Sequence, residues 1–267
     1  MKNRKRPGAF PSARQDEEAA RHFRDTPQTR SPSYRLAFAD PEFLLREDLR
    51  PVRLQLELLK PELALQEANI VSTIVVFGSA RTPPREGPSA DERMRDYEEA
   101  RRFARLISER EINNGLHSVI VTGGGPGIME AANRGAREAG ARTIGLNIVL
   151  PHEQAPNSYI TPELSFQFHY FAIRKMHFLM RARALVCFPG GFGTLDELFE
   201  TLTLIQTGKI APIPVLLFRE AWWRRIVNFE AMAEAGMIAP EDLEIFDFVE
   251  SADAACDLVD AFYKAGP

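Results

Sequence analysis

The chain has 267 residues, of which 45% are hydrophobic and 26% charged, with a formal net charge of −4. That length and balance predict one large domain, or one domain with an extension, folded around a real core. They exclude a protein that is basic throughout, and the absence of any run of about 18 apolar residues excludes a membrane-spanning helix. Cys187 and Cys256 lie in apolar stretches, which excludes a disulfide scaffold and favours a reducing compartment, the cytoplasm.

The first 39 residues differ in composition from the rest of the chain. Residues 1–35 hold nine Lys or Arg against four acidic residues, and they are rich in Pro, Ser and Gln without an apolar period. Such a segment cannot bury enough apolar surface to offset its ordering entropy. We therefore interpret residues 1–39 as a basic arm without fixed structure. A solvated tail is the simplest role for it, and binding to RNA or a membrane is the alternative. For the protein as a whole we expect neither nucleic acid nor membrane as a partner.

Residues 40–69 are predicted to form a helical extension. Asp40 and Pro41 suit an N-cap followed by a first-turn proline, and leucines then recur at helical spacing. Pro51 and Pro61 should divide the segment into short helices. We expect this extension to pack on the main domain or on a second subunit.

Residues 70–267 alternate between strand and helix patterns. The predicted strands cover 70–77, 117–121, 142–149, 164–168, 184–188, 214–218 and 246–249. The predicted helices cover 91–114, 128–139, 171–183, a segment ending near 207, 222–235 and 251–263. This alternation predicts an α/β fold with a doubly wound parallel sheet and helices on both faces. Ligands of such sheets bind at the carboxyl ends of the strands, so the glycine-bearing turns there are the candidate site.

The first of two informative glycine turns reads GGGPGIME at 123–130, between a strand and a helix. Glycines let the backbone approach an anion, and the following helix offers unpaired N–H groups. Ile128 stands where a dinucleotide fingerprint needs its third glycine, and no Gly-Lys-Ser/Thr follows as in a P-loop. Such a turn is as often a packing device as a binding site.

The second turn reads PGGFGTLDE at 189–197 and suits a phosphate monoester better than a pyrophosphate. Thr194 and Glu197 have the spacing of a capping box, so structural and catalytic roles for Glu197 are evenly supported by chemistry alone. Arg174, His177 and Arg181 would share one face of the preceding helix. That basic face could stand beside the phosphate turn or simply be solvated.

Together these motifs resemble the Lonely Guy family, whose members were long mislabelled as lysine decarboxylases. The resemblance rests on GGGPGIMEAAN (123–133), the Arg174-Lys175 pair and PGGFGTLDE, within about 70–264. GSAR (78–81) and the helical extension are similar to the longer bacterial branch. The resemblance implies a Rossmann-like homodimer, or a larger assembly of dimers. It also implies hydrolysis of the N-glycosidic bond of nucleoside 5′-monophosphates to free base and ribose 5-phosphate. Cytokinin riboside monophosphates and AMP are the family's usual substrates.

Carried onto this chain, the family's catalytic pair falls on Arg174 and Glu197. The residues implied to bind phosphate or nucleotide are Ser79, Gly123, Gly124, Gly125, Gly127, Met129, Lys175, Gly190, Gly191, Gly193 and Thr194. Ile173 stands where short plant-type members have an acid, which puts cytokinin specificity in question.

No cofactor and no metal is implied, and no lysine has a persuasive context for a pyridoxal phosphate Schiff base. Two alternatives stay open. One is a non-catalytic nucleotide or molybdenum-cofactor carrier or sensor on the same fold. The other is an interaction protein that uses its basic arm.

Overall fold

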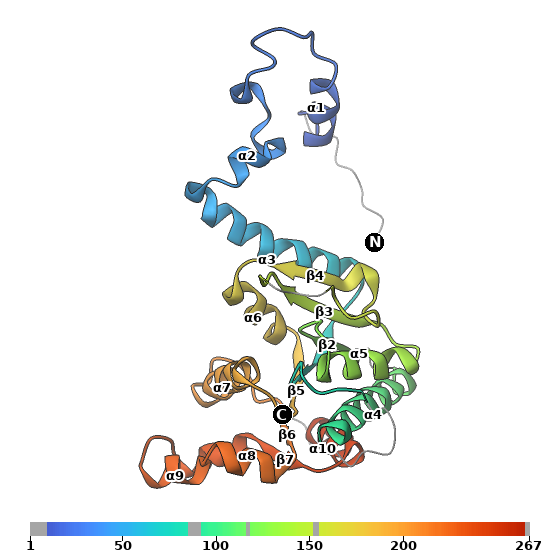
Figure 1. Ribbon diagram of the computed structural model, residues 1–267, viewed down its shortest axis with the longest axis vertical. Helices are drawn as coiled ribbons and strands as arrows, with labels where there is room; N and C mark the ends of the chain where they lie inside the picture. Colours follow the sequence, from blue (N-terminus) through green and yellow to red (C-terminus); the bar gives the residue numbers. More distant parts are fainter. Residues whose placement is uncertain (1–9, 85–91, 116–117, 152–154, 265–267) are drawn as a thin grey trace. The chain divides into compact units, whose positions relative to one another are not determined.

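The computed structural model describes residues 10–84, 92–115, 118–151 and 155–264 (Figure 1). The chain divides into two compact units, Met1–Leu56 and Glu57–Pro267. The described part of the first unit contains α1 (Ala13–Ala20), α2 (Pro41–Leu44) and three 3₁₀ turns. Helix α1 forms within the arm that we expected to lack fixed structure, because Ser12 and Gln15 make a reciprocal capping box.

Helix α3 (Arg50–Glu67) joins the two units, and it corrects the prediction of short helices in the extension. Pro51 lies in the first turn, where a backbone N–H has no intrahelical partner in any case. Pro61 lies inside the helix and is buried together with Leu65. Burial of this face stabilises the helix enough for it to continue past the missing hydrogen bond.

The second unit is built on a seven-stranded sheet in which every neighbouring pair is parallel. The strand order is β4-β3-β2-β1-β5-β6-β7. The strands are β1 (Ser72–Phe77), β2 (Ser118–Thr122), β3 (Thr143–Ile148), β4 (Ser165–Phe168), β5 (Ala182–Cys187), β6 (Val215–Phe218) and β7 (Asp247–Val249). The chain builds one half outward from β1 and the other outward from β5, which confirms the doubly wound α/β fold. The switch point of the strand order lies between β1 and β5.

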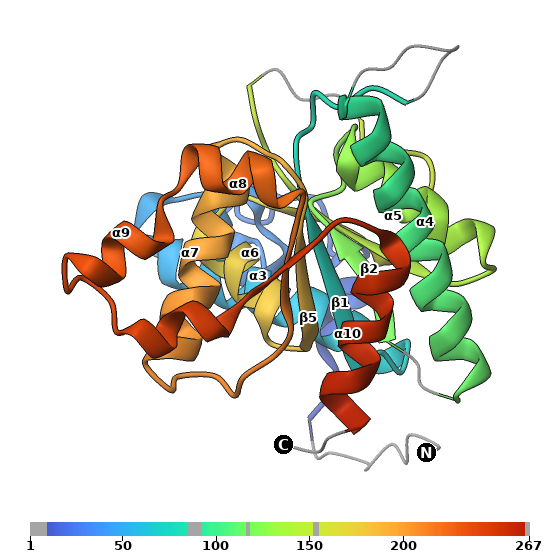
Figure 2. The ribbon, with the colours of Figure 1, turned by 90° about the horizontal axis from the view of Figure 1, so that it is seen from below.

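Helices cover both faces of the sheet (Figure 2). On one face lie α4 (Glu92–Asn113), α5 (Ile128–Glu138) and α10 (Ala252–Lys264). On the other lie α6 (Phe171–Leu179), α7 (Phe192–Gln206), α8 (Glu220–Ile226), α9 (Phe229–Glu234) and the end of α3. Strand β1 alternates between the two cores: Ile74 and Val76 enter the first, and Val75 and Phe77 the second. A strand buried on both faces explains the continuous apolar run in the sequence.

Two helices differ most from the prediction. The helix predicted at 222–235 is divided into α8 and α9, because Val227 is extended, with φ −132° and ψ 122°. Helix α6 ends at Leu179, earlier than predicted, and β5 begins at Ala182. Cys187 and Cys256 are buried free thiols. None of the helices in the described part of the chain is long and apolar enough to cross a membrane.

Candidate active site

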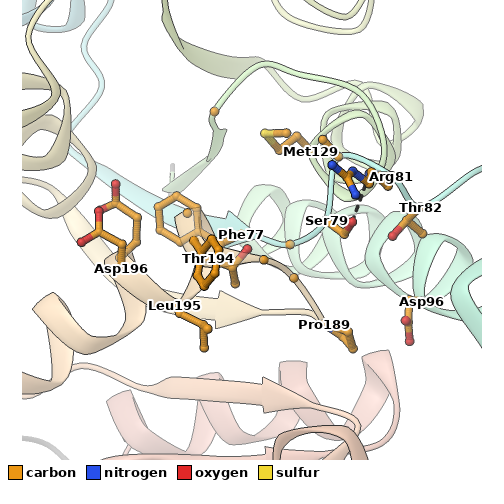
Figure 3. Close-up of a pocket in the computed structure, with 18 of the residues that line it drawn as sticks. Phe77, Ser79, Arg81, Thr82, Asp96, Met129, Pro189, Thr194, Leu195 and Asp196 are labelled. Atoms are coloured by element: carbon orange, nitrogen blue, oxygen red, sulfur yellow. Dashed lines mark hydrogen bonds between the residues drawn. The ribbon is translucent and has the colours of Figure 1, made fainter. Parts of the chain in front are cut away.

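A cavity of about 860 Å³ opens at the carboxyl ends of β1 and β5, at the switch point of the sheet (Figure 3). Its walls include the loop after β1, residues 78–82, and the loop after β5, residues 189–191. The first turns of α7, residues 192–197, also line the cavity. In Figure 3, Thr194 lies between Asp196 at one end of the cavity and Asp96 at the other. This is the edge of the sheet at which the sequence predicted a ligand.

The N-terminus of α7 lies at this cavity. The helix begins at Phe192 after Gly191, and the N–H groups of Thr194 and Leu195 donate to the carbonyl of Gly191. The earliest N–H groups of a helix have no intrahelical acceptor and form an anion-binding site. A Cβ added at Gly191 or Gly193 would meet no other atom within 4 Å. These two glycines therefore face open space, in which an anion can reach the backbone.

The expected capping box at Thr194 and Glu197 is absent, which corrects the structural interpretation of this motif. The helix begins at Phe192, before Thr194, and its N-cap is Gly191. Thr194 and Glu197 therefore lie at the third and sixth helical positions, where no N-cap bond is made. The Thr194 side chain instead packs on Gly190, where an added Cβ would lie 2.1 Å from Oγ1. Glu197 is thus left without the capping role that would explain its presence.

The carboxyl group of Glu197 is buried at the cavity wall. The residue is 6% exposed, and its side chain has no hydrogen bond to any described residue. Burial raises the pKa of Glu197 to about 7, although nearby Lys175 and Arg174 oppose the shift. A carboxyl group with a pKa near neutrality can exchange a proton with substrate or water at physiological pH.

Arg174 reaches the same cavity from α6. Its Nε donates to the carbonyl of Leu146 at 2.8 Å, and its guanidinium lies 5.2 Å from the centre of the Phe178 ring. A Cβ at Gly123 would lie 2.6 Å from Nη2 of Arg174. Gly123 is therefore glycine because the guanidinium occupies the space where a side chain would begin.

The other glycines of the first turn are packed by protein atoms. Gly124, at φ +78°, lies against the Asn147 side chain, and a Cβ at Gly125 would lie 2.7 Å from the Met129 side chain. Gly127, at φ +70°, lies against the carbonyl of Ser79, which accepts the Ile128 N–H at 3.1 Å. The first N–H of α5 is thereby occupied within the protein. For these three glycines the structure favours a packing role over a binding one.

Lys175 follows Arg174 but is not part of the cavity wall. Its ammonium group makes ion pairs with Asp196 at 3.0 Å and Glu200 at 2.9 Å. Although burial opposes the shift, these carboxylates raise the pKa of Lys175 above its usual value. Lys175 therefore ties α6 to α7 and contributes positive charge near Glu197.

The predicted basic face of α6 does not form. His177 is buried, and Arg181 lies beyond the end of the helix, where it pairs with Glu62 at 2.7 Å. Of the three residues expected on that face, Arg174 alone lines the cavity. Because α6 ends at Leu179, helical spacing no longer relates Arg181 to Arg174.

Comparison with known proteins agrees with the motifs. A family model described as possible lysine decarboxylase matches residues 129–259. The chain is 28% identical over 153 residues to cytokinin riboside 5′-monophosphate phosphoribohydrolase LOG3 of Arabidopsis thaliana, covering 56% of this chain and 68% of that protein. It is also 26% identical over 186 residues to probable cytokinin riboside 5′-monophosphate phosphoribohydrolase LOG4 of Oryza sativa subsp. japonica. That match covers 68% of this chain and 74% of the rice protein.

The chain is thus similar to the Lonely Guy family over about half of its length. The family model leaves out β1 and α4, and therefore the Ser79 loop that forms one wall of the cavity. Among solved structures, the molybdenum cofactor binding protein of Rippkaea orientalis aligns with a TM-score of 0.48 and 20% identity over 72% of this chain and 96% of that one. The molybdenum cofactor carrier protein of Chlamydomonas reinhardtii gives 0.48 and 18% over 72% and 98%. Similarities at this level do not bear on function.

The residues suggested by the Lonely Guy motifs fall into two groups. Those that line the cavity are Ser79, Gly123, Met129, Arg174, Gly190, Gly191, Gly193, Thr194 and Glu197. Those outside its lining are Gly124, Gly125, Gly127 and Lys175. The structure thus brings both members of the implied catalytic pair and the whole second glycine turn to one cavity.

Sequence reasoning missed one charged end of the cavity. Arg219 follows β6 at φ +69°, and its guanidinium pairs with Asp96 at 3.1 Å and Glu92 at 2.7 Å. Arg219 and Asp96 both line the cavity, together with Arg81 and Arg93. The position of Arg219 at the end of a parallel strand could have indicated it. Asp96 gave no such signal, because it looks like any acid on an amphipathic helix.

Proposed function

We propose that this protein hydrolyses the N-glycosidic bond of nucleoside 5′-monophosphates, AMP or a cytokinin riboside 5′-monophosphate, to free base and ribose 5-phosphate. The observation that carries the proposal is the buried Glu197 carboxyl, with a pKa near 7, in one cavity with Arg174 and the open N-terminus of α7. The names of the Arabidopsis and rice relatives support the same reaction.

The N-terminus of α7 is suited to the 5′-phosphate. Gly191 and Gly193 leave its first N–H groups accessible, and Thr194, whose side chain packs on Gly190, adds a hydroxyl. Phosphate binding there fixes the ribose relative to Glu197, which lies about one turn further along the same helix. Because this binding energy is used to position the reacting bond, a nucleoside without the phosphate should lose turnover as well as affinity.

Cleavage of the glycosidic bond develops positive charge on the ribose ring. The ionised Glu197 carboxylate stabilises that charge and accepts a proton from the attacking water. The water oxygen bonds to the anomeric carbon as the bond to the base nitrogen breaks, and that nitrogen keeps the electron pair. The base takes up one proton from solvent, and Glu197 returns the proton of the attacking water to solvent. A single carboxylate performs this role here, in contrast to the carboxylate pair of ordinary glycosidases.

Arg174 provides the complementary positive charge. Its planar guanidinium presents a fork of N–H donors to the phosphate or to the ribose hydroxyls, while Leu146 and Gly123 fix its orientation. Ser79, Gly123 and Met129 line the nucleotide. Gly124, Gly125, Gly127 and Lys175 act by holding the loops and α7 in place.

We further propose that the active protein is a homodimer, or an assembly of dimers. Phe192 is 92% exposed at the cavity rim, and Phe171 and Ile226 beside the cavity are also exposed. A second copy would cover these apolar side chains and complete the site. Sedimentation of the purified protein, with turnover measured at the same concentrations, tests this, and a fully active monomer would contradict it.

The function is tested by incubating the purified protein with AMP, GMP, IMP, CMP, UMP and isopentenyladenosine monophosphate. Adenosine serves as the control without phosphate, and free base is followed by chromatography. We expect base release from monophosphates and none from adenosine, with the order of rates naming the substrate. Tight nucleotide binding without base release would instead support a carrier or sensor.

A further inference from the structure

The middle of α3 approaches the start of α6, the helix that carries Arg174 (Figure 1). The Glu57 carboxylate accepts two backbone hydrogen bonds, from His169 N–H at 2.8 Å and from Tyr170 N–H at 3.0 Å. Tyr170 is the N-cap of α6, and its own side chain makes no capping bond. Glu57 thus caps α6 from a distant part of the chain and places a negative charge at the positive end of the helix.

The same stretch of α3 also holds the segment that follows α6. Both terminal nitrogens of Arg181 donate to the Glu62 carboxylate at 2.7 Å, and Nε donates to the carbonyl of Ile70 at 3.2 Å. The two side chains are only 13% and 20% exposed, so water screens this bidentate pair weakly. The hydrogen bonds from Arg181 hold the pKa of Glu62 below its usual value.

Arg174 lies between these two points of attachment and tolerates little displacement. Its guanidinium lies close to both the Gly123 backbone and the Phe178 ring, and its Nε donates to the carbonyl of Leu146. A small shift of α6 along its axis or about it would move the guanidinium out of this position. Misplacement of a reacting group by about 1 Å can cost about 100-fold in rate.

We propose that Glu57 is a positioning residue for Arg174: it fixes the start of α6, and Glu62 with Arg181 fixes the segment after it. The segment from Glu57 to Glu62 is therefore part of the machinery that orients the catalytic site. This inference rests on the proposed function.

The experiment compares Glu57→Gln with Glu67→Gln in the full-length protein. Glu67 lies on the same helix, is exposed and has no hydrogen bond or ion pair to a described residue, so it controls for loss of charge. In Glu57→Gln, an amide NH₂ group replaces one of the two carboxylate oxygens. One of the backbone N–H groups of His169 and Tyr170 then faces a donor in place of an acceptor. We expect kcat for base release to fall about 10-fold in Glu57→Gln and to stay unchanged in Glu67→Gln. Glu62→Gln should lower kcat in the same direction, and it serves if Glu57→Gln does not fold.

A double-mutant cycle separates positioning from mere stabilisation. If Glu57 acts through Arg174, adding Glu57→Gln to Arg174→Ala should lower kcat no further. An unchanged kcat in folded Glu57→Gln, or an equal loss in both backgrounds, would overturn the proposal.

Calorimetric measurement of ribose 5-phosphate binding tests the role of Glu57 by a readout that does not depend on hydrolysis. We expect Glu57→Gln to weaken binding about 5-fold and Glu67→Gln to leave it unchanged. If the wild-type protein binds ribose 5-phosphate but releases no base, the proposed function fails while the positioning role is still decided by this measurement. Equal affinities of Glu57→Gln and wild type would overturn the positioning role alone.

Discussion

The two glycine turns of this chain lie on either side of β1, at the ends of β2 and β5, and differ in what fills the space beside them. In the turn at 123–127 protein atoms occupy nearly every position where a side chain would begin, including the Arg174 guanidinium beside Gly123. In the turn at 189–193 the space beside Gly191 and Gly193 is open. Glycine thus serves close packing in the first turn and access to the helix N-terminus in the second.

This difference assigns the two turns distinct parts in one site. The first turn holds the arginine and links the loops after β1 and β2 through the hydrogen bond from Ile128 N–H to the Ser79 carbonyl. The second leads directly into the helix that carries Glu197 and presents its N–H groups to the cavity. Substitutions in the first turn should therefore lower the stability of the fold or displace the Arg174 side chain. Substitutions in the second should weaken ligand binding or lower the rate of hydrolysis.

The largest effect is expected on the side of the second turn, from Glu197→Gln. Removing the carboxylate should lower kcat at least about 100-fold, because it takes away the buried group that stabilises the charge on the ribose and accepts the proton from water. Steady-state kinetics of base release from AMP would measure the loss, with circular dichroism to confirm folding. Turnover close to that of wild type would remove Glu197 from the catalytic pair.

A sharper comparison of the two turns comes from Gly127→Ala against Gly193→Ala. Gly127 has φ +70° and ψ −130°, a conformation open almost only to glycine, and a new Cβ would lie 2.3 Å from the Ser79 carbonyl oxygen. We expect Gly127→Ala to reduce the free energy of unfolding by about 2 kcal/mol. Gly193→Ala places its Cβ in open space and should leave the unfolding midpoint unchanged while raising KM for AMP. Denaturant unfolding and kinetics of both variants test this, and equal destabilisation would erase the distinction.

Gly123→Ala tests whether the first turn acts through Arg174. The new Cβ would displace Nη2, which lies 2.6 Å away, and the guanidinium would have to move. We expect kcat to fall about 10-fold in the wild-type background and to change little in an Arg174→Ala background. Equal losses in the two backgrounds would show that Gly123 acts on something other than Arg174.

The smallest expected effect is on stability and depends on pH. The pKa of Glu197 is about 7 in the folded protein and about 4.5 when unfolded, so between these values the folded state binds the extra proton. Stability from this group is therefore lost as pH rises from about 4.5 to about 7. Glu197→Gln should be more stable than wild type by about 1 kcal/mol at about pH 8, because part of the gain is offset by the lost attraction of the carboxylate to Lys175 and Arg174. Denaturant unfolding at about pH 5 and about pH 8 tests this, and a gain at the lower pH instead would contradict it.

The sequence predicts the sheet and the location of the site well for identifiable reasons. Runs of apolar and β-branched residues such as 72–77 belong to strands buried on both faces, and parallel strands bring their carboxyl ends to one edge. The place where α7 begins was not predicted, because the capping-box rule favoured Thr194 while the glycines before it let the helix start at Phe192. The continuous α3 was not predicted because burial of Pro61 outweighs a local propensity.

Long-range partners were also beyond sequence reasoning. The contacts of Glu57 with the start of α6 span more than 100 residues, and nothing in the local pattern marks this acid among the others of the extension. Asp96 is hidden in the same way among the charges of α4. Motif spacing finds residues near a turn, whereas residues brought to the site by packing need the structure.

The most direct test of the central claim is the pH dependence of adenine release from AMP in single turnovers, from about pH 5 to about pH 9. An ionised Glu197 as the catalytic carboxylate predicts a rate that rises about 10-fold per pH unit below about pH 7 and then levels off, with no such rise in Glu197→Gln. A wild-type rate that does not change with pH across this range, or no release of adenine at any pH, would contradict the account.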